Sequence, residues 1–369
     1  MDFALTAEQE AIQRTFHGFA EREIRPRARE LDERPEFPRA LFEQLGALGF
    51  FGMRYPAPLG SGADIVSCVF AIEELAWGSL SVAAACTMQS LMGTWFLHRF
   101  GSPAIKERLL EPALRGAKIG AICMTEPDAG SDLFALATKA RLEGSGWRLS
   151  GSKTWVTSAP VADFFTVFAR TGEDRLGVFL VERGAPGLDV GRSIEKMGVR
   201  SSLTSEVRLS DVPAALLGEE GAGAKYLREI LAEIRVVTAA MALGVGRAAY
   251  EEARRYASER QQFGKPIDRH QAIQAHLADM ATELEAARRL THWAAWRSDQ
   301  GLPNAREASM AKLFASEVAH RVCDHAARVT ASYGFAADSP VQRYLRDARF
   351  LLIGGGTSEI LRINIARES

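Results

Sequence analysis

A loop at residues 124–132 contains the residue types that can hold a flat, polar heterocycle. Its sequence is MTEPDAGSD, in which Pro127 and Gly130 interrupt regular structure and leave backbone N–H groups free to point outward. Thr125 and Ser131 add hydroxyl groups, so the loop could hydrogen-bond the edge of a heteroaromatic ring or a phosphate. Taken alone, such a stretch is more often an ordinary surface turn.

Two later segments favour the binding role. Residues 153–157 have the sequence KTWVT, in which Trp155 offers a flat aromatic face and Thr157 a hydroxyl group. Arg260 precedes the turn sequence FGKP at residues 263–266, between two helical patterns, and this arrangement suits a cation presented to a pyrophosphate from a fixed corner. An exposed arginine at the end of a helix is the alternative for Arg260 considered alone.

Hydrophobic periodicity predicts the elements that position these groups. Residues 6–114 show the three- and four-residue spacing of helices, and Thr6 can cap the first of them. Short β-prone runs bounded by Gly, Pro, Asp and Ser follow at residues 147–150, 164–168, 177–181 and 206–209. Beyond residue 223 the helical spacing returns, with one apolar face formed by Leu277, Met280, Leu284 and Ala287.

We therefore predict a mainly α fold with a β insert. An N-terminal helical domain is expected at residues 1–118, a small antiparallel β domain at 119–222 and a C-terminal helical bundle at 223–369. A chain of 369 residues is long for a single core, which agrees with two or three packed units.

Composition excludes several classes of partner. The chain has 45 Lys and Arg against 46 Asp and Glu, so nothing favours binding to nucleic acid or to an anionic membrane. Its four cysteines are far apart and its histidines are not clustered, so neither disulfides nor a metal site is predicted. There is no signal-peptide pattern and no uncharged apolar run of about eighteen residues. We expect a soluble, cytoplasmic protein.

Four sequence blocks, in the same order, resemble the acyl-CoA dehydrogenases. They are MTEPDAGSD at 124–132, KTWVT at 153–157, RQQFGKPI at 260–267 and RDAR at 346–349. The resemblance covers nearly the whole chain and implies an oxidoreductase that uses FAD and acts on an acyl thioester, carried by CoA or by an acyl-carrier protein. It also implies that electrons pass to an electron-transfer flavoprotein or to oxygen.

The same resemblance implies which residues bind FAD. Ile122, Met124, Thr125, Gly130, Ser131, Trp155, Val156 and Thr157 would line the flavin ring, although many relatives have an aromatic residue in place of Ile122. Arg260, Gln262, Phe263, Ile267, His270 and Gln271 would reach the FAD of a neighbouring subunit, which implies a homo-oligomer, a tetramer in most relatives. Arg328, Ser332, Thr357 and Glu359 complete the implied set; Arg328 replaces the usual glutamine, and Ala331-Ser332 replaces a pair of glycines.

The catalytic base of the family has no counterpart at either of its two known positions. Many relatives have a glutamate that removes the substrate α-proton where this chain has Gly355, and others have it on a helix at the position of Ile234, beside an arginine matched by Arg235. With glycine in place of glutamate, the side-chain base is lost, but the backbone N–H of Gly355 is kept and would hold the thioester oxygen.

Three explanations for the absent base stay open. The neighbouring Glu233 could act if the helix were rotated, but adjacent helical residues point about 100° apart. Another carboxylate could serve, although Glu359 is implied to face the FAD adenine and Glu126 to stabilise the loop. The chemistry could instead differ, as in related desulfinases, oxidases, monooxygenases or reductases. Outside enzymes, a non-catalytic flavin-binding subunit of a heteromer would also explain both substitutions.

Overall fold

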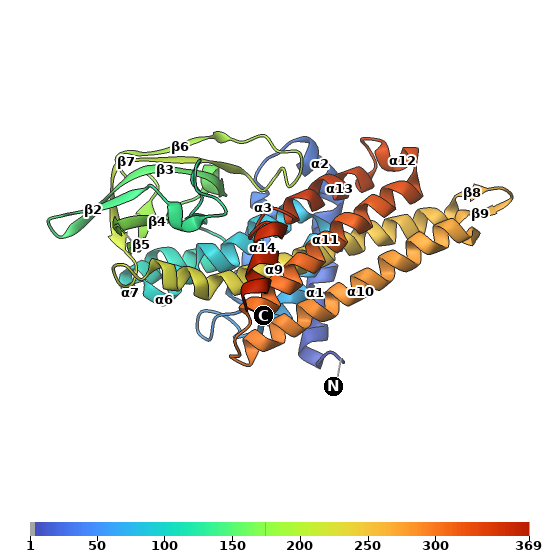
Figure 1. Cartoon of the computed structure of the whole chain (residues 1–369), viewed down its shortest axis with the longest axis horizontal. Helices are drawn as coiled ribbons and strands as arrows, with labels where there is room; N and C mark the ends of the chain where they lie inside the picture. Colours follow the sequence, from blue (N-terminus) through green and yellow to red (C-terminus); the bar gives the residue numbers. More distant parts are fainter. Residues whose placement is uncertain (1–3, 174, 369) are drawn as a thin grey trace.

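The computed structural model describes residues 4–173 and 175–368. Figure 1 shows a β-sheet at one end of the long axis, with helices filling the centre and the other end. The chain is helical up to residue 114, forms its large sheet between Gly120 and Leu216, and is again mainly helical from Gly223. The predicted mainly α fold with a β insert is confirmed, and the predicted domain boundaries fall just before the first strand and just before the long helix α9.

The N-terminal helices pack around a buried apolar core. Thr6 caps the first helix in a full capping box with Gln9, as its hydroxyl predicted. The helices are α1 (Ala7–Phe19), α2 (Ala28–Glu33), α3 (Arg39–Ala47), α4 (Ile65–Gly78), α5 (Leu80–Thr87), α6 (Trp95–Phe100), α7 (Pro103–Ile105) and α8 (Glu111–Leu114). The stretch Leu80–Phe100 is apolar and long enough to cross a membrane, but 89% of its most apolar 18 residues are buried inside the protein, as expected for core helices.

The sheet contains the four predicted β runs, which lie within β3, β4, β5 and β7. Its strands are β1 (Gly120–Cys123), β2 (Lys139–Glu143), β3 (Gly146–Thr157), β4 (Phe164–Gly172), β5 (Arg175–Glu182), β6 (Leu188–Ser193) and β7 (Thr204–Leu216). Most pairs are antiparallel, as predicted, but β1 and β2 each pair in parallel with β4. The crossovers between these strands permit parallel pairing, which a two-residue hairpin could not. Because β5 pairs with both β4 and β7, the strands close into a small barrel.

A 37-residue helix, α9 (Gly223–Glu259), runs through the C-terminal part and packs against α4, α10 and α11. The remaining elements are β8 (Gln261–Gln262), β9 (Lys265–Pro266), α10 (Gln271–Asp299), α11 (Ala305–Thr330), α12 (Ser332–Phe335), α13 (Pro340–Leu351) and α14 (Ser358–Glu368). The predicted apolar face of α10 is confirmed, because Met280, Leu284 and Ala287 are buried and Leu277 packs against the core. Figure 1 shows the β8–β9 hairpin at the end of the molecule farthest from the sheet.

Candidate functional site

A buried ion pair fixes the loop that follows β1. The Nζ of Lys153, which is fully buried in β3, lies 2.8 Å from Oε1 of Glu126 and donates to the carbonyl of Met124 at 3.1 Å. The Glu126 carboxylate also accepts the backbone N–H groups of Ala137, at 2.6 Å, and Thr138, at 3.0 Å. Glu126 therefore stabilises the loop, as the sequence indicated, and its carboxylate is already occupied by these donors.

The charges of this pair depend on each other. Burial opposes ionisation of Glu126, but the hydrogen bonds from Lys153 and from Thr138 and Ala137 outweigh it and lower the pKa of the carboxyl group. Burial lowers the pKa of Lys153 despite the nearby carboxylate. Neither side chain can lose its partner without a large energetic cost, because the remaining charge would stay buried and unpaired.

Trp155 stands out of the sheet on a bulge in β3. The pairing of β3 with β7 shifts register between Lys153 and Val156, and Trp155 between them has φ +55°, which is rare for a bulky residue. Its side chain is 57% exposed, whereas Val156 is buried. The bulge thus presents one flat aromatic ring to solvent beside the loop.

The other predicted flavin-ring residues lie at different depths in this region. Ile122 is buried in β1, so its side chain belongs to the core more than to an open surface. Met124, Thr125 and Thr157 are half-buried, and Gly130 and Ser131 are exposed at the loop tip. A Cβ on Gly130 would meet only the Cγ2 of Thr125, at 4.0 Å, so the backbone there is open to close approach.

The turn before α14 brings both predicted base positions together. Gly355 has φ +71°, and an ideal Cβ on it would lie 3.1 Å from Oγ1 of Thr238 and 3.6 Å from Cγ2 of Ile234. Both neighbours are buried on α9, and neither is a carboxylate. The Gly355 N–H donates to no acceptor in the part of the chain that the structure describes, so it is available to a ligand.

Two buried cations lie behind this turn. The Nζ of Lys312 donates to the carbonyl of Gly356 at 2.6 Å, and Arg235 donates to Oγ of Ser309 at 3.0 Å while its Nε has no hydrogen-bond partner. Burial lowers the pKa of both, that of Lys312 to about 8. No ion pair is formed by either within residues 4–173 and 175–368. Arg235, the predicted helix arginine, thus faces α11, and Lys312 is the cation that contacts the turn.

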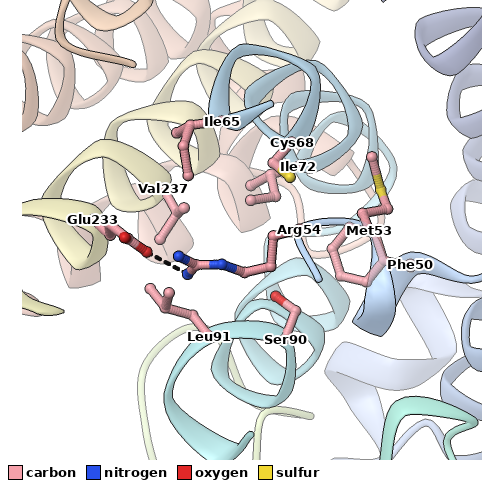
Figure 2. Close-up of a pocket in the computed structure, with 10 residues that line it drawn as sticks. All are labelled: Phe50, Met53, Arg54, Ile65, Cys68, Ile72, Ser90, Leu91, Glu233 and Val237. Atoms are coloured by element: carbon pink, nitrogen blue, oxygen red, sulfur yellow. Dashed lines mark ion pairs between the residues drawn. The ribbon is translucent and has the colours of Figure 1, made fainter. Parts of the chain in front are cut away.

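Glu233, the predicted weak base candidate, points to a different pocket. Figure 2 shows it paired with Arg54, which follows the short helical turn η3 (Phe50–Gly52). The two side chains form an ion pair, but their geometry is not that of a well-aligned hydrogen bond. Burial acts to lower the pKa of Arg54, but the adjacent carboxylate outweighs it and raises that pKa.

The pocket around this pair is small and mainly apolar. It encloses about 20 Å³, room for roughly one water molecule. Its lining is Phe50, Met53, Arg54, Ile65, Cys68, Ile72, Ser90, Leu91, Glu233 and Val237. On α9, Glu233 and Val237 face this pocket, while Ile234 and Thr238 face Gly355. Glu233 is therefore held by Arg54 on a different face of α9 from the one that lies against the turn.

The third predicted group lies on the β8–β9 hairpin and near it. Phe263 has φ +53° and is 93% exposed, and its ring meets that of His270 edge to face. Arg260 is exposed, as are Gln262 and Gln271, whereas Ile267 is buried at the base of the hairpin.

The remaining predicted FAD residues lie on α11, α12 and the start of α14. Arg328 is paired at 2.7 Å with Asp324 one turn back on α11, and Ser332 begins α12. Thr357 accepts the N–H of Ile360 at 3.3 Å, and Glu359 is exposed. Among the residues described, no three His, Cys, Asp or Glu side chains gather as a metal site.

Comparison with known families covers nearly the whole chain. The family model described as "Acyl-CoA dehydrogenase, N-terminal domain" matches residues 6–117, the middle-domain model matches 121–212, and the C-terminal-domain model matches 221–369. The chain belongs to the acyl-CoA dehydrogenase family. The resemblance inferred from the four sequence blocks is thereby confirmed.

Individual acyl-CoA dehydrogenase relatives match over their full lengths. The chain is 59% identical to the benzylmalonyl-CoA dehydrogenase of Aromatoleum aromaticum, across 100% of this chain and 99% of that protein. It is 39% identical to the 3-(aryl)acrylate reductase of Clostridium sporogenes, across 98% of each. The solved structure of butyryl-CoA dehydrogenase from Megasphaera elsdenii superposes with a TM-score of 0.96 at 35% identity, across 100% of this chain and 99% of that one.

As an acyl-CoA dehydrogenase family member, the protein is an oxidoreductase that binds FAD. The region around β1 and β3 fits a flavin, because it offers the exposed Trp155 ring, the hydroxyl groups of Thr125 and Ser131, and an open backbone at Gly130. The sheet from which the flavin loop (residues 124–132) extends and the β8–β9 hairpin lie at opposite ends of the long axis (Figure 1). This separation agrees with the predicted site shared between subunits, which stays a proposal.

Replacing Arg260 with Ala tests this shared site. We expect the variant to lose FAD and to dissociate more readily than the wild type, because a phosphate contact across a subunit boundary stabilises both. Visible absorbance after gel filtration reports flavin content, and light scattering reports the mass. Arg254→Ala, on the exposed surface of α9, is the matched control. A flavin-loaded wild-type monomer would contradict the shared site.

Sequence reasoning missed Arg54 and Thr238. Neither belongs to a recognisable motif, and Arg54 meets Glu233 only because the N-terminal helices pack onto α9. One signal was present for Thr238: it lies one helical turn after Ile234, so it shares that residue's face. The bulge at Trp155 had no local signal.

Proposed function

We propose that the protein desaturates an arylmalonyl-CoA, with loss of CO2 in place of removal of an α-proton by a side chain. The product would be the corresponding 3-arylacrylyl-CoA. The observation that carries the proposal is the lack of a carboxylate at Gly355, where the nearest atoms belong to Thr238 and Ile234. The ion pair of Glu233 with Arg54 supports it further, because the carboxylate next to Ile234 on α9 is already paired with a cation.

Two relatives support an aryl substrate. Benzylmalonyl-CoA, named in the relative that is 59% identical, carries a benzyl group and a carboxylate on the carbon next to the thioester. The name of the Clostridium sporogenes relative includes an aryl acrylate, which has the carbon skeleton of the proposed product. A substrate with its own α-carboxylate needs no protein base, which agrees with both substitutions in this chain.

The bonds and charges balance without a protein base. The bond between Cα and the carboxylate breaks, CO2 leaves, and the electron pair stays on Cα, where the thioester carbonyl delocalises it. That pair then forms the Cα=Cβ double bond as a hydride leaves Cβ. FAD, when bound, supplies the hydride acceptor of this two-electron oxidation. The α-hydrogen of the substrate stays on Cα throughout.

The residues around the turn have defined tasks in this reaction. The free N–H of Gly355 would donate to the thioester oxygen, where negative charge grows as CO2 leaves. Lys312, by binding the carbonyl of Gly356, would hold the turn in place and add positive potential behind it. These interactions stabilise the delocalised electron pair without accepting a proton.

The proposal extends to the partners. We propose CoA as the carrier, an electron-transfer flavoprotein as the electron acceptor, a cytoplasmic location and a homotetramer. The family membership and the shared site inferred above support these assignments.

The decisive experiment compares two thioesters that differ by one carboxylate. Anaerobic mixing of the FAD-loaded protein with benzylmalonyl-CoA should bleach the flavin and release one CO2 and one cinnamoyl-CoA per flavin. We expect 3-phenylpropionyl-CoA to bleach it at least about 100-fold more slowly, since a positioned base contributes about 100- to 10,000-fold. Rapid bleaching by 3-phenylpropionyl-CoA, or none by benzylmalonyl-CoA, would contradict the proposal.

Glu233→Gln separates this proposal from a relocated base. The amide keeps the shape of the side chain beside Arg54 and removes its ability to accept a proton. We expect turnover of benzylmalonyl-CoA to stay within a few-fold of the wild type. A loss of about 100-fold or more would assign the base to Glu233.

A further inference from the structure

We propose that Thr238 binds the substrate carboxylate that leaves as CO2, in the space that a side chain at position 355 would occupy. This inference rests on the proposed function and adds the residue that recognises its α-carboxylated substrates. It concerns a threonine on α9 that belongs to none of the four sequence blocks.

Geometry places Thr238 at this space. A Cβ on Gly355 would lie 3.1 Å from Oγ1 of Thr238, and its other close neighbours are Cγ2 of Ile234 at 3.6 Å and Cβ of Thr238 at 3.9 Å. Thr238 thus offers the nearest polar atom to the missing side chain. A substrate held at the Gly355 N–H would have its α-carbon beside this space, so a group on that carbon can reach the hydroxyl.

The hydroxyl can serve as a donor with little rearrangement. Its Oγ1 now donates to the carbonyl of Ile234 at 2.7 Å, one turn back on α9. That carbonyl also lies within the α-helix, where it accepts a backbone N–H. Rotation of the threonine side chain therefore redirects its proton toward a carboxylate without leaving the carbonyl unsatisfied.

Charge around the space favours an anion. Arg235 and Lys312 lie behind the turn and have no carboxylate paired with them among the described residues, while Glu233 is neutralised by Arg54. Glu317 and Glu359 act on Lys312, and Glu368 acts on Arg235, without forming an ion pair with it, so both cations are able to attract an anionic group that enters next to Gly355. A glutamate at 355 would supply such an anion from the protein; here the substrate supplies it.

The character of the space also suits loss of CO2. One hydroxyl holds the carboxylate, and the side chain of Ile234 forms an apolar wall. A carboxylate that is only partly hydrogen-bonded in such surroundings is disfavoured relative to neutral CO2. Thr238 would therefore orient the carboxylate without stabilising it fully.

Thr238→Val and Thr238→Ser test the assignment. Valine keeps the shape and removes the hydroxyl, so we expect kcat/KM for benzylmalonyl-CoA to fall about 10- to 100-fold, the size of a lost hydrogen bond to a charged group. Inhibition by cinnamoyl-CoA, which lacks the carboxylate, should change less than about two-fold. Serine should restore kcat/KM to within a few-fold, and visible absorbance confirms that each variant retains FAD.

The outcomes separate this inference from the proposed function. If Thr238→Val weakens substrate and cinnamoyl-CoA equally, or changes neither, Thr238 does not read the carboxylate and the inference fails. If serine fails to rescue, a hydroxyl is not what matters and it also fails. If the wild type releases no CO2 from benzylmalonyl-CoA, the proposed function itself fails, and the assignment of Thr238 with it.

Discussion

Replacing Gly355 with Glu should give the protein an activity that we expect it to lack, the α,β-dehydrogenation of 3-phenylpropionyl-CoA. The new carboxylate would stand at a position from which relatives remove the α-proton, and positioned bases contribute about 100- to 10,000-fold. The same variant should lose turnover of benzylmalonyl-CoA, because its carboxylate would fill the space beside Thr238 and repel the carboxylate of the substrate. Anaerobic flavin reduction by each thioester measures both changes.

The backbone at this position shapes the design of the control. Gly355 has φ +71°, a conformation that costs other residues about 1–2 kcal/mol, and a Cβ there would crowd Oγ1 of Thr238 at 3.1 Å. Gly355→Gln carries the same strain without a base, so the difference between the two variants reports the carboxylate alone. Ile234→Glu offers a second route from a regular helix. Equal activity of the Glu and Gln variants, with no gain at Ile234→Glu, would refute the expectation.

Replacing Lys153 with Met should lower the free energy of unfolding by about 3–5 kcal/mol, the range for removing one partner of a buried ion pair. Methionine fills a similar volume, but it leaves the Glu126 carboxylate buried at 5% exposure with only its two backbone donors. The flavin loop should loosen with it, so FAD retention should fall too. Urea unfolding of the flavin-free protein and flavin content after gel filtration measure the two effects.

A double variant provides the matched control. Lys153→Met combined with Glu126→Gln removes both charges and keeps an amide oxygen for the N–H groups of Ala137 and Thr138. We expect it to be more stable than Lys153→Met alone, because no uncompensated charge stays buried. If the double variant is the less stable of the two, the cost comes from lost packing and the ion-pair account is wrong.

The sequence could predict the fold and could mark a candidate flavin region, because both depend on local signals. Helical and β periodicity located the helices and four of the strands. Pro127 and Gly130 predicted the loop at residues 124–132. The parallel pairing of β1 with β4 could not be predicted, because it joins segments separated by two other strands.

The details of the site depend on tertiary contacts that no motif encodes. Trp155 has a positive φ because β3 bulges against β7, and periodicity gives no sign of a bulge. Glu233 stayed open as a base until its partner was known, and that partner, Arg54, lies far away in the sequence. Gly355 showed which side chain is missing, but only the fold shows that Thr238 faces the same space.

The separation of the sheet, which carries the flavin loop, from the β8–β9 hairpin at the other end of the long axis has a genetic consequence (Figure 1). Under the proposed shared site, a chain damaged only in its loop and a chain damaged only in its hairpin are each unable to build an active centre alone. Co-assembled, the intact loop of one meets the intact hairpin of the other, and the opposite centre carries both defects. An inactive allele damaged in the loop and an inactive allele damaged in the hairpin should therefore complement each other in one cell. Two alleles damaged in the same region should not.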